Sequence, residues 1–197
     1  MENEGGFFKD VTLELGGGDL QTCGMISDAL WLDIDGDSDA DLITVGEWTG
    51  IQVFEMTNGK LRKKEHEWQD LTGMWQSITA VDLDGDGDPD VVVVSSSSFE
   101  VHENTGGLTF AAPLPGPGGW GLLKEVAAAD LDLDGISDLV VTHGAPPFVS
   151  VASVYLGTSD MTWLAETRYG LEYDIEHVAF SDVDKDGRLD LLATSYL

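Results

Sequence analysis

The segment Asp82-Leu83-Asp84-Gly85-Asp86-Gly87-Asp88-Pro89-Asp90, followed by the apolar run Val91–Val94, decides the fold of this chain. Similar segments begin at Asp33, Asp130 and Asp182, so the four starts are separated by 49, 48 and 52 residues. Of the 24 Asp residues in the chain, 18 lie in these segments, which concentrates the acidic charge at one point of each repeat. A period of this length predicts a propeller, a solenoid or another repeat array.

Short apolar, β-branched runs surround each acidic segment, and Gly, Asp, Asn or Pro interrupts them too often for helices. Four such runs per repeat predict an all-β array of four-stranded propeller blades. The expected first strands contain Ala29–Leu32, Ile78–Val81, Val126–Ala129 and Val178–Phe180, and the second Leu42–Val45, Val91–Val94, Leu139–Val141 and Leu191–Ala193. The expected third strands contain Val53–Phe54, Val101–His102 and Val154–Tyr155, and the fourth Leu61–His66, Leu108–Ala111 and Met161–Ala165.

The pattern predicts a single repeat domain over residues 1–197, with units at about 14–66, 67–115, 116–168 and 169–197. Residues 1–13 would complete the last unit, because Glu2–Phe7 resembles Glu103–Leu108 and Phe7–Leu13 then corresponds to a fourth strand. Pairing of residues 1–13 with the last unit would close the array into a ring. The alternative is that both ends belong to a larger array.

The composition restricts the possible partners. With 37 Asp and Glu against 9 Lys and Arg, the formal net charge is −28, which excludes binding of nucleic acid through a basic face. Hydrophobic residues make up 42% of the chain, enough for a core. No apolar stretch approaches the roughly 18–20 residues that span a bilayer, so we expect no membrane span. The single Cys23 excludes an internal disulfide.

Asp stands at positions 1, 3, 5 and 9 of every acidic segment, whereas position 7 varies and would contribute its backbone carbonyl. Alternate carboxylates converging on one point suit Ca²⁺, which takes 6–8 oxygen ligands. Mg²⁺ is the second choice, and the lack of a recurring His or Cys argues against Zn²⁺. We expect up to four ions. The predicted ligands are Asp33, Asp35, Asp37, Asp39, Asp41, Asp82, Asp84, Asp86, Asp88, Asp90, Asp130, Asp132, Asp134, Ile136, Asp138, Asp182, Asp184, Asp186, Arg188 and Asp190.

Two other interpretations of these segments were weighed. An EF-hand is rejected because its bidentate Glu would fall on Thr44, Val93, Val141 and Ala193. Solvated acidic turns without a metal remain the plainer alternative, since Asp and Gly favour turns. Metal binding is favoured because all four segments have the same Asp spacing and lie at the same place in the repeat.

The segment 82–94 resembles the FG-GAP (or VCBS) repeat of integrin α-subunit propellers and fungal propeller lectins. Lys9–Thr12, Ala29–Trp48 and Gly73–Asp82 are most similar to the cartilage-acidic-protein-like branch of secreted repeat proteins. The resemblance implies a β-propeller, usually of seven blades, with calcium at the Asp positions and an extracellular or cell-surface location. Four units are fewer than that ring needs. Leu133 and Lys185 at position 4, and Arg188 at position 7, also depart from the pattern.

From these features we expect a non-enzymatic, calcium-binding extracellular module that binds a glycan or a protein. Trp48 and Trp120 border glycine-rich loops, and Pro146, Pro147 and Phe148 form an insertion found in one unit, so these are the predicted ligand contacts. One alternative is a lyase or dehydratase acting on a polysaccharide or sugar, which the scatter of the 9 basic residues and 4 His along the sequence disfavours. Another is a structural subunit that self-associates through its terminal strands.

Overall fold

The computed structural model describes residues 1–65, 73–116, 122–145, 149–164, 166–171 and 174–195. It is mostly β, with antiparallel strands grouped into four consecutive units. Unit 1 contains β3 (Met25–Leu32), β4 (Asp41–Thr49), β5 (Gln52–Thr57) and β6 (Lys60–Lys64). Unit 2 contains β7 (Gly73–Val81), β8 (Asp90–Ser95), β9 (Phe99–His102) and β10 (Leu114–Pro115). Unit 3 contains β11 (Leu122–Ala129), β12 (Asp138–Ala145), β13 (Val149–Tyr155) and β14 (Thr167–Leu171), and unit 4 contains β15 (Ile175–Ser181) and β16 (Asp190–Ser195).

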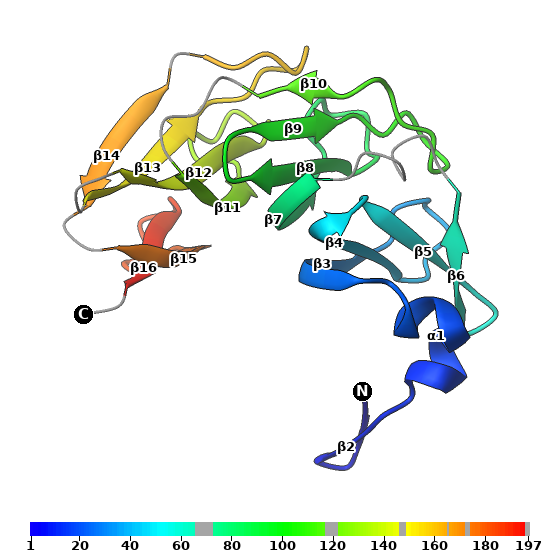
Figure 1. Ribbon diagram of the computed structural model, residues 1–197. Coiled ribbons are helices and arrows are strands. Elements are labelled where there is room, and N and C mark those ends of the chain that lie inside the picture. Colours follow the sequence, from blue (N-terminus) through cyan, green and yellow to red (C-terminus); the bar gives the residue numbers. More distant parts are fainter. Residues whose placement is uncertain (66–72, 117–121, 146–148, 165, 172–173, 196–197) are drawn as a thin grey trace.

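The units follow one another along an arc, and the two chain ends lie at its opposite arms (Figure 1). Within each unit the strands pair in chain order. Units 1 and 2 are also joined where β4 pairs with β7, so their strands form one sheet. Repeating blades are thus present, whereas the described residues do not close a ring.

The hydrophobic core lies between neighbouring units. Val91 and Val93 of β8 pack with Ile43 and Val45 of unit 1, while the alternate residues of β8 pack with Leu139 and Val141 of unit 3. Successive side chains of a strand point to opposite faces, so a strand buried between two units is apolar at every position. This explains the continuous apolar runs after each acidic segment.

The predicted strand Phe7–Leu13 is wrong in its second half. β1 (Glu2–Glu4) and β2 (Phe7–Lys9) pair only with each other, and helix α1 (Thr12–Gln21) follows. The Thr12 N–H donates to the Asp10 carboxylate at 2.9 Å, as in an Asx turn, while Val11 before the helix provides no side-chain cap. Residues 1–13 therefore do not pair with unit 4.

Helix α1 covers one face of unit 1. Leu15 and Leu20 of the helix pack against a cluster formed by Leu42, Phe54 and Leu61. Leu42 corresponds to Val91 and Leu139, which pack against the preceding unit. The helix thus covers the part of unit 1 around Leu42, Phe54 and Leu61, where a preceding unit would otherwise pack. A capping element plays the same role in repeat proteins.

Two predicted fourth strands are also corrected. Leu108–Ala111 and Met161–Ala165 form only isolated bridges, Asn104 with Phe110 and Gly157 with Trp163, while residue 165 lies outside the described part. β10 and β14 take the fourth place instead. Of the expected strand Leu61–His66, the structure has Lys60–Lys64, and His66 is outside the described residues. Outer strands have one solvated edge, which leaves a weaker apolar pattern.

A β-bulge recurs in the first strand of every unit, at register shifts beside Asp28, Ser77, Glu125 and His177. In two places the carboxylate at the bulge bonds to the next unit. Asp28 accepts the Ile78 N–H at 3.1 Å, and Glu125 accepts the Val178 N–H at 2.8 Å. The bulge therefore links neighbouring units.

Within the part of the chain that the structure describes, no helix has the length and apolar character needed to cross a membrane.

Candidate functional site: four Asp-rich loops

The acidic segments form four loops between the first and second strands of their units: loop 1 (residues 33–41), loop 2 (82–90), loop 3 (130–138) and loop 4 (182–190). The carboxylate at position 1 organises each loop. In loop 2, Asp82 accepts the N–H groups of Gly85 at 2.7 Å and Gly87 at 3.0 Å. Asp33 and Asp130 accept the equivalent pair of bonds in loops 1 and 3. In loop 4, Asp182 accepts the N–H groups of Asp186, at position 5, and Gly187.

Positions 4 and 6 have positive φ in all four loops, which turns the chain around the position 1 carboxylate. Glycine adopts this conformation without steric cost, and it stands at five of these eight places. Ser38, Leu133 and Lys185 hold the remaining three, at φ 75°, 67° and 63°. The two departures from the repeat at position 4 therefore keep the loop conformation.

Positions 3 and 5 continue the winding of each loop. In loop 2, Asp84 accepts the Asp86 N–H at 3.0 Å, and Asp86 accepts the Asp88 N–H at 2.8 Å. The same contacts recur in loops 1, 3 and 4. The residue at position 7 thus donates its N–H in every loop, while its carbonyl as a metal ligand stays a prediction.

The carboxylate at position 9 braces the loop against the rest of its unit. Asp90 is fully buried and accepts two backbone N–H groups at 2.8 Å, from Leu83 at position 2 and from Asn104 just after β9. Asp41 and Asp138 make the same two kinds of bond in units 1 and 3. Sequence analysis treated position 9 only as a ligand and missed this structural role.

Burial raises the pKa of the position 9 carboxyls. The pKa of Asp90 rises to about 6, because desolvation outweighs the two N–H bonds and the nearby Asp84 and Asp86 add repulsion. The pKa values of Asp41 and Asp138 are raised for the same main reason. Burial also raises the pKa of Asp35. These loops hold carboxylates that are costly to ionise unless a cation is near.

Three carboxylates in each loop offer oxygen atoms within 4.8 Å of one another. Two oxygens bound to one Ca²⁺ at 2.3–2.6 Å cannot be farther apart than about 5 Å, so these sets fit a shared hard cation. Loops 1 and 2 use positions 1, 3 and 5: Asp33, Asp35, Asp37 and Asp82, Asp84, Asp86. Loops 3 and 4 use positions 1, 3 and 9: Asp130, Asp132, Asp138 and Asp182, Asp184, Asp190.

Loop 4 differs from the others in its surroundings. Asp190 accepts the Val183 N–H at 2.9 Å but is exposed, and no third strand of the described chain lies beside β16. Lys185 and Arg188 of this loop are exposed as well.

Of the five predicted ligand contacts, Trp48 lies within the residues that the structure describes. Trp48 lies within β4 rather than in a loop, at a bulge between Glu47 and Thr49 where β4 meets β7. Its side chain is 76% exposed and its φ is 60°, a rare conformation for a bulky residue. Trp120, Pro146, Pro147 and Phe148 lie outside the described residues.

The basic residues are not scattered, as sequence analysis had assumed. Lys60, Arg62, Lys63 and Lys64 form most of β6, the outer strand of unit 1, and make up four of the nine cations. Lys64 pairs with Glu55 of β5 at 2.5 Å. Counting Lys and Arg per expected strand would have found this run. Lysine on an outer strand also discourages pairing with other sheets.

Comparison with known families accounts for the loops. The profile of the FG-GAP-like repeat matches residues 33–93 and 82–141, more than half of the chain. The chain belongs to the FG-GAP-like repeat family. Loops 1, 2 and 3 lie within the matched residues, and loop 4 lies beyond them with the same contacts. FG-GAP repeats imply propeller blades, in agreement with the meandering units.

Solved structures share this fold at low identity. An Agrocybe aegerita lectin, described for its specific recognition of non-reducing terminal N-acetylglucosamine, aligns with a TM-score of 0.57 and 19% identity over 83% of this chain. The Photorhabdus luminescens Tc holotoxin pore aligns with a TM-score of 0.53 and 21% identity over 83% of this chain. The FG-GAP chain spans 45% of the lectin and 8% of the toxin chain. No curated protein matches its sequence.

Proposed function

We propose that this FG-GAP chain is an extracellular, non-enzymatic binding module for glycans whose loops are held in shape by up to four Ca²⁺ ions. The observation that carries the proposal is the recurrence of one carboxylate arrangement at four equivalent corners of the fold. Each arrangement offers only oxygen ligands, which suits Ca²⁺ better than Zn²⁺. The cation would supply charge neutralisation between the loop carboxylates and would not take part in a reaction.

Two observations support a glycan as the ligand. The lectin whose fold is similar recognises a sugar, although its low identity supports only the fold. Trp48 is exposed, and an exposed indole offers an apolar face on which a sugar ring can stack. The strained backbone at Trp48 favours a functional role, because such conformations concentrate at binding sites.

The calcium part of the proposal is tested by calorimetric titration of metal-stripped protein, with thermal melts before and after. We expect about four ions to bind and the melting temperature to rise, since a ligand of the folded state stabilises it by about 2.7 kcal/mol at a hundred times its Kd. The double variant Asp84→Asn with Asp86→Asn should bind one ion fewer. Asp19→Asn, an exposed Asp in α1, is the control with unchanged stoichiometry. Failure to bind at millimolar Ca²⁺ would refute the proposal.

A further inference from the structure

Trp31 stands where the other units contact the unit before them. It lies two residues before loop 1, and the equivalent residues are Ala80, Ala128 and Phe180. Ala80 packs against the core shared with unit 1, and Ala128 against the core shared with unit 2. Trp31 therefore belongs to the face of unit 1 that a preceding unit would cover.

Helix α1 covers only the outer part of that face. Leu15 and Leu20 reach the cluster around Phe54, whereas Trp31 on β3 stays 53% exposed. At the same position the chain has a large aromatic side chain in place of alanine. The equivalent alanines pack between two units, whereas Trp31 is exposed, so packing in the core does not explain why this position holds a Trp.

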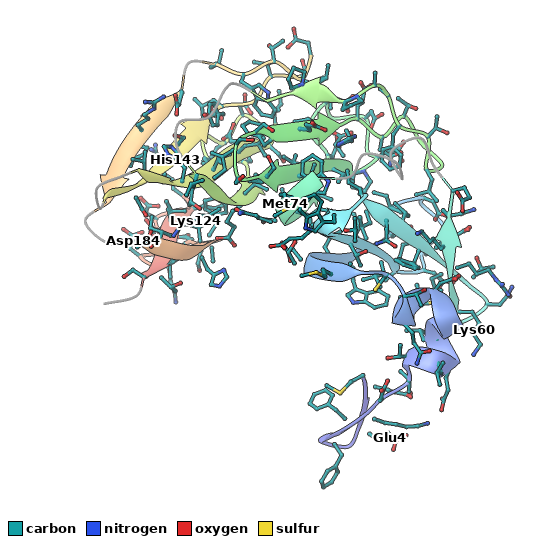
Figure 2. All side chains as sticks on the ribbon, in the orientation of Figure 1. Glu4, Lys60, Met74, Lys124, His143 and Asp184 are labelled. Atoms are coloured by element: carbon teal, nitrogen blue, oxygen red, sulfur yellow. The ribbon has the colours of Figure 1, made fainter. Side chains whose placement is uncertain are left out.

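A groove of about 570 Å³ opens beside Trp31, bounded by α1, the N-terminal hairpin and the turn between β5 and β6. Its volume falls within the roughly 300–1,000 Å³ of small-ligand sites. The lining residues that matter here are Glu2, Glu14, Leu15, Trp31 and Lys60. Lys60 lies at the foot of β6 beside the helix, as Figure 2 shows, and donates to the backbone carbonyl of Glu14.

The chemistry of this lining favours a neutral sugar. The indole of Trp31 offers a flat apolar face for the C–H side of a pyranose ring, and the carboxylates of Glu2 and Glu14 can accept hydrogen bonds from its hydroxyl groups. The Glu14 carboxylate forms a salt bridge with Lys9 at 3.2 Å, so the carboxylates of Glu2 and Glu14 and the ammonium groups of Lys9 and Lys60 are equal in number around the groove. The groove therefore holds no unpaired excess of cations for a sulfated or uronic acid sugar, which the net charge of −28 on the chain would also repel.

We propose that the groove between α1 and unit 1 is a binding site for a neutral saccharide, with Trp31 as its stacking platform. The inference rests on the proposed glycan-binding function and assigns a specific site to it. The helix makes this site possible, because it takes the place of a neighbouring unit and leaves the inner part of the face open. The site differs from the one predicted at Trp48, which lies at the bulge where β4 meets β7.

The test measures binding of a panel of neutral glucose, galactose, mannose and N-acetylglucosamine oligosaccharides to calcium-loaded protein by saturation-transfer NMR and calorimetry. Trp31→Ala should weaken the best ligand at least tenfold, and Glu2→Gln should weaken it by a smaller factor. Trp48→Ala is measured in parallel to separate the two candidate sites. Tyr169→Ala is the matched control, an aromatic side chain of unit 3 that is 54% exposed, and should bind as the wild type does. Thermal melts confirm that the variants are folded.

The possible outcomes separate the two proposals. Unchanged affinity in Trp31→Ala would overturn the groove as the site, while the glycan function would stand. Loss of affinity in Trp48→Ala alone would assign the ligand to the β4 bulge instead. If no oligosaccharide of the panel binds the wild type, both the site and the glycan function are refuted.

Discussion

Asp90 gives the metal-free protein a pH dependence of unusual sign. Its pKa is raised to about 6 in the folded state from an ordinary value of 3.8, so the folded state holds the proton more tightly than the unfolded chain. Stability from this group is therefore greatest at low pH and is lost as the pH rises through about 6. Most Asp residues behave in the opposite way, because favourable charge partners lower their pKa.

The magnitude follows from the two pKa values. Between pH 7 and pH 5 the folded state takes up about eight-tenths of a proton at Asp90, and the unfolded chain takes up almost none. Integrating this difference gives a gain of about 1.3 kcal/mol in the free energy of unfolding. Desolvation lowers the pKa of His143, which acts in the opposite direction over the same range. The contribution of Asp90 must therefore be isolated by a variant.

Urea denaturation of the wild type and Asp90→Asn, both stripped on a chelating resin, isolates that contribution. The free energy of unfolding of the wild type minus that of Asp90→Asn should rise by about 1.3 kcal/mol on going from pH 7 to pH 5, because the contribution of His143 is common to both proteins. Saturating Ca²⁺ should remove this rise, since protons then compete with a bound cation. If the quantity stays constant or falls on acidification of the metal-free protein, the assignment of a costly buried charge to Asp90 is refuted.

Two further substitutions test the loop conformation and the contact between units. Ser38→Gly should raise the free energy of unfolding, measured by urea denaturation, by about 1 kcal/mol, because serine at φ 75° is strained and glycine is not. Gly87→Ser should lower the free energy of unfolding by a similar amount. A Ser38→Gly variant less stable than the wild type would contradict this reasoning. Glu125→Ala should lower the free energy of unfolding by about 1–3 kcal/mol, because it leaves the buried Val178 N–H without its acceptor. Glu125→Gln keeps an acceptor oxygen and should retain most of the stability. Equal stability of Glu125→Ala and the wild type would exclude the contact.

The inner strands and the loops could be predicted from sequence because their physical constraints are strict. A strand buried on both faces must be apolar throughout, as Val91–Val94 is, and its ends are set by the neighbouring loop. The loop itself needs a fixed Asp spacing and two positive φ values, which glycine marks directly. Both signals recur four times, so each unit supports the interpretation of the others.

Helix α1 could not be predicted by the same means. The resemblance of Glu2–Phe7 to Glu103–Leu108 suggested a strand after it, but the later residues are held by contacts to unit 1. Gly16, Gly17 and Gly18 are poor helix formers, and the helix is interrupted at Gly17, where φ is 56°. Packing of Leu15 and Leu20 against unit 1 overrode local propensity.

The four loops are alike in backbone contacts but not in environment, and this difference orders their expected affinities. In units 1, 2 and 3 the position 9 carboxylate is buried and accepts an N–H group from within or just after the third strand, so a cation there stabilises the whole unit. In loop 4 the same residue, Asp190, is exposed and tied only to its own loop. Ion binding at loop 4 therefore gains less from preorganisation, and its two basic side chains reduce the local negative potential. Within the described chain no third strand supports loop 4, whereas each of the first three loops is supported by the third strand of its own unit, so we expect loop 4 to bind its ion most weakly.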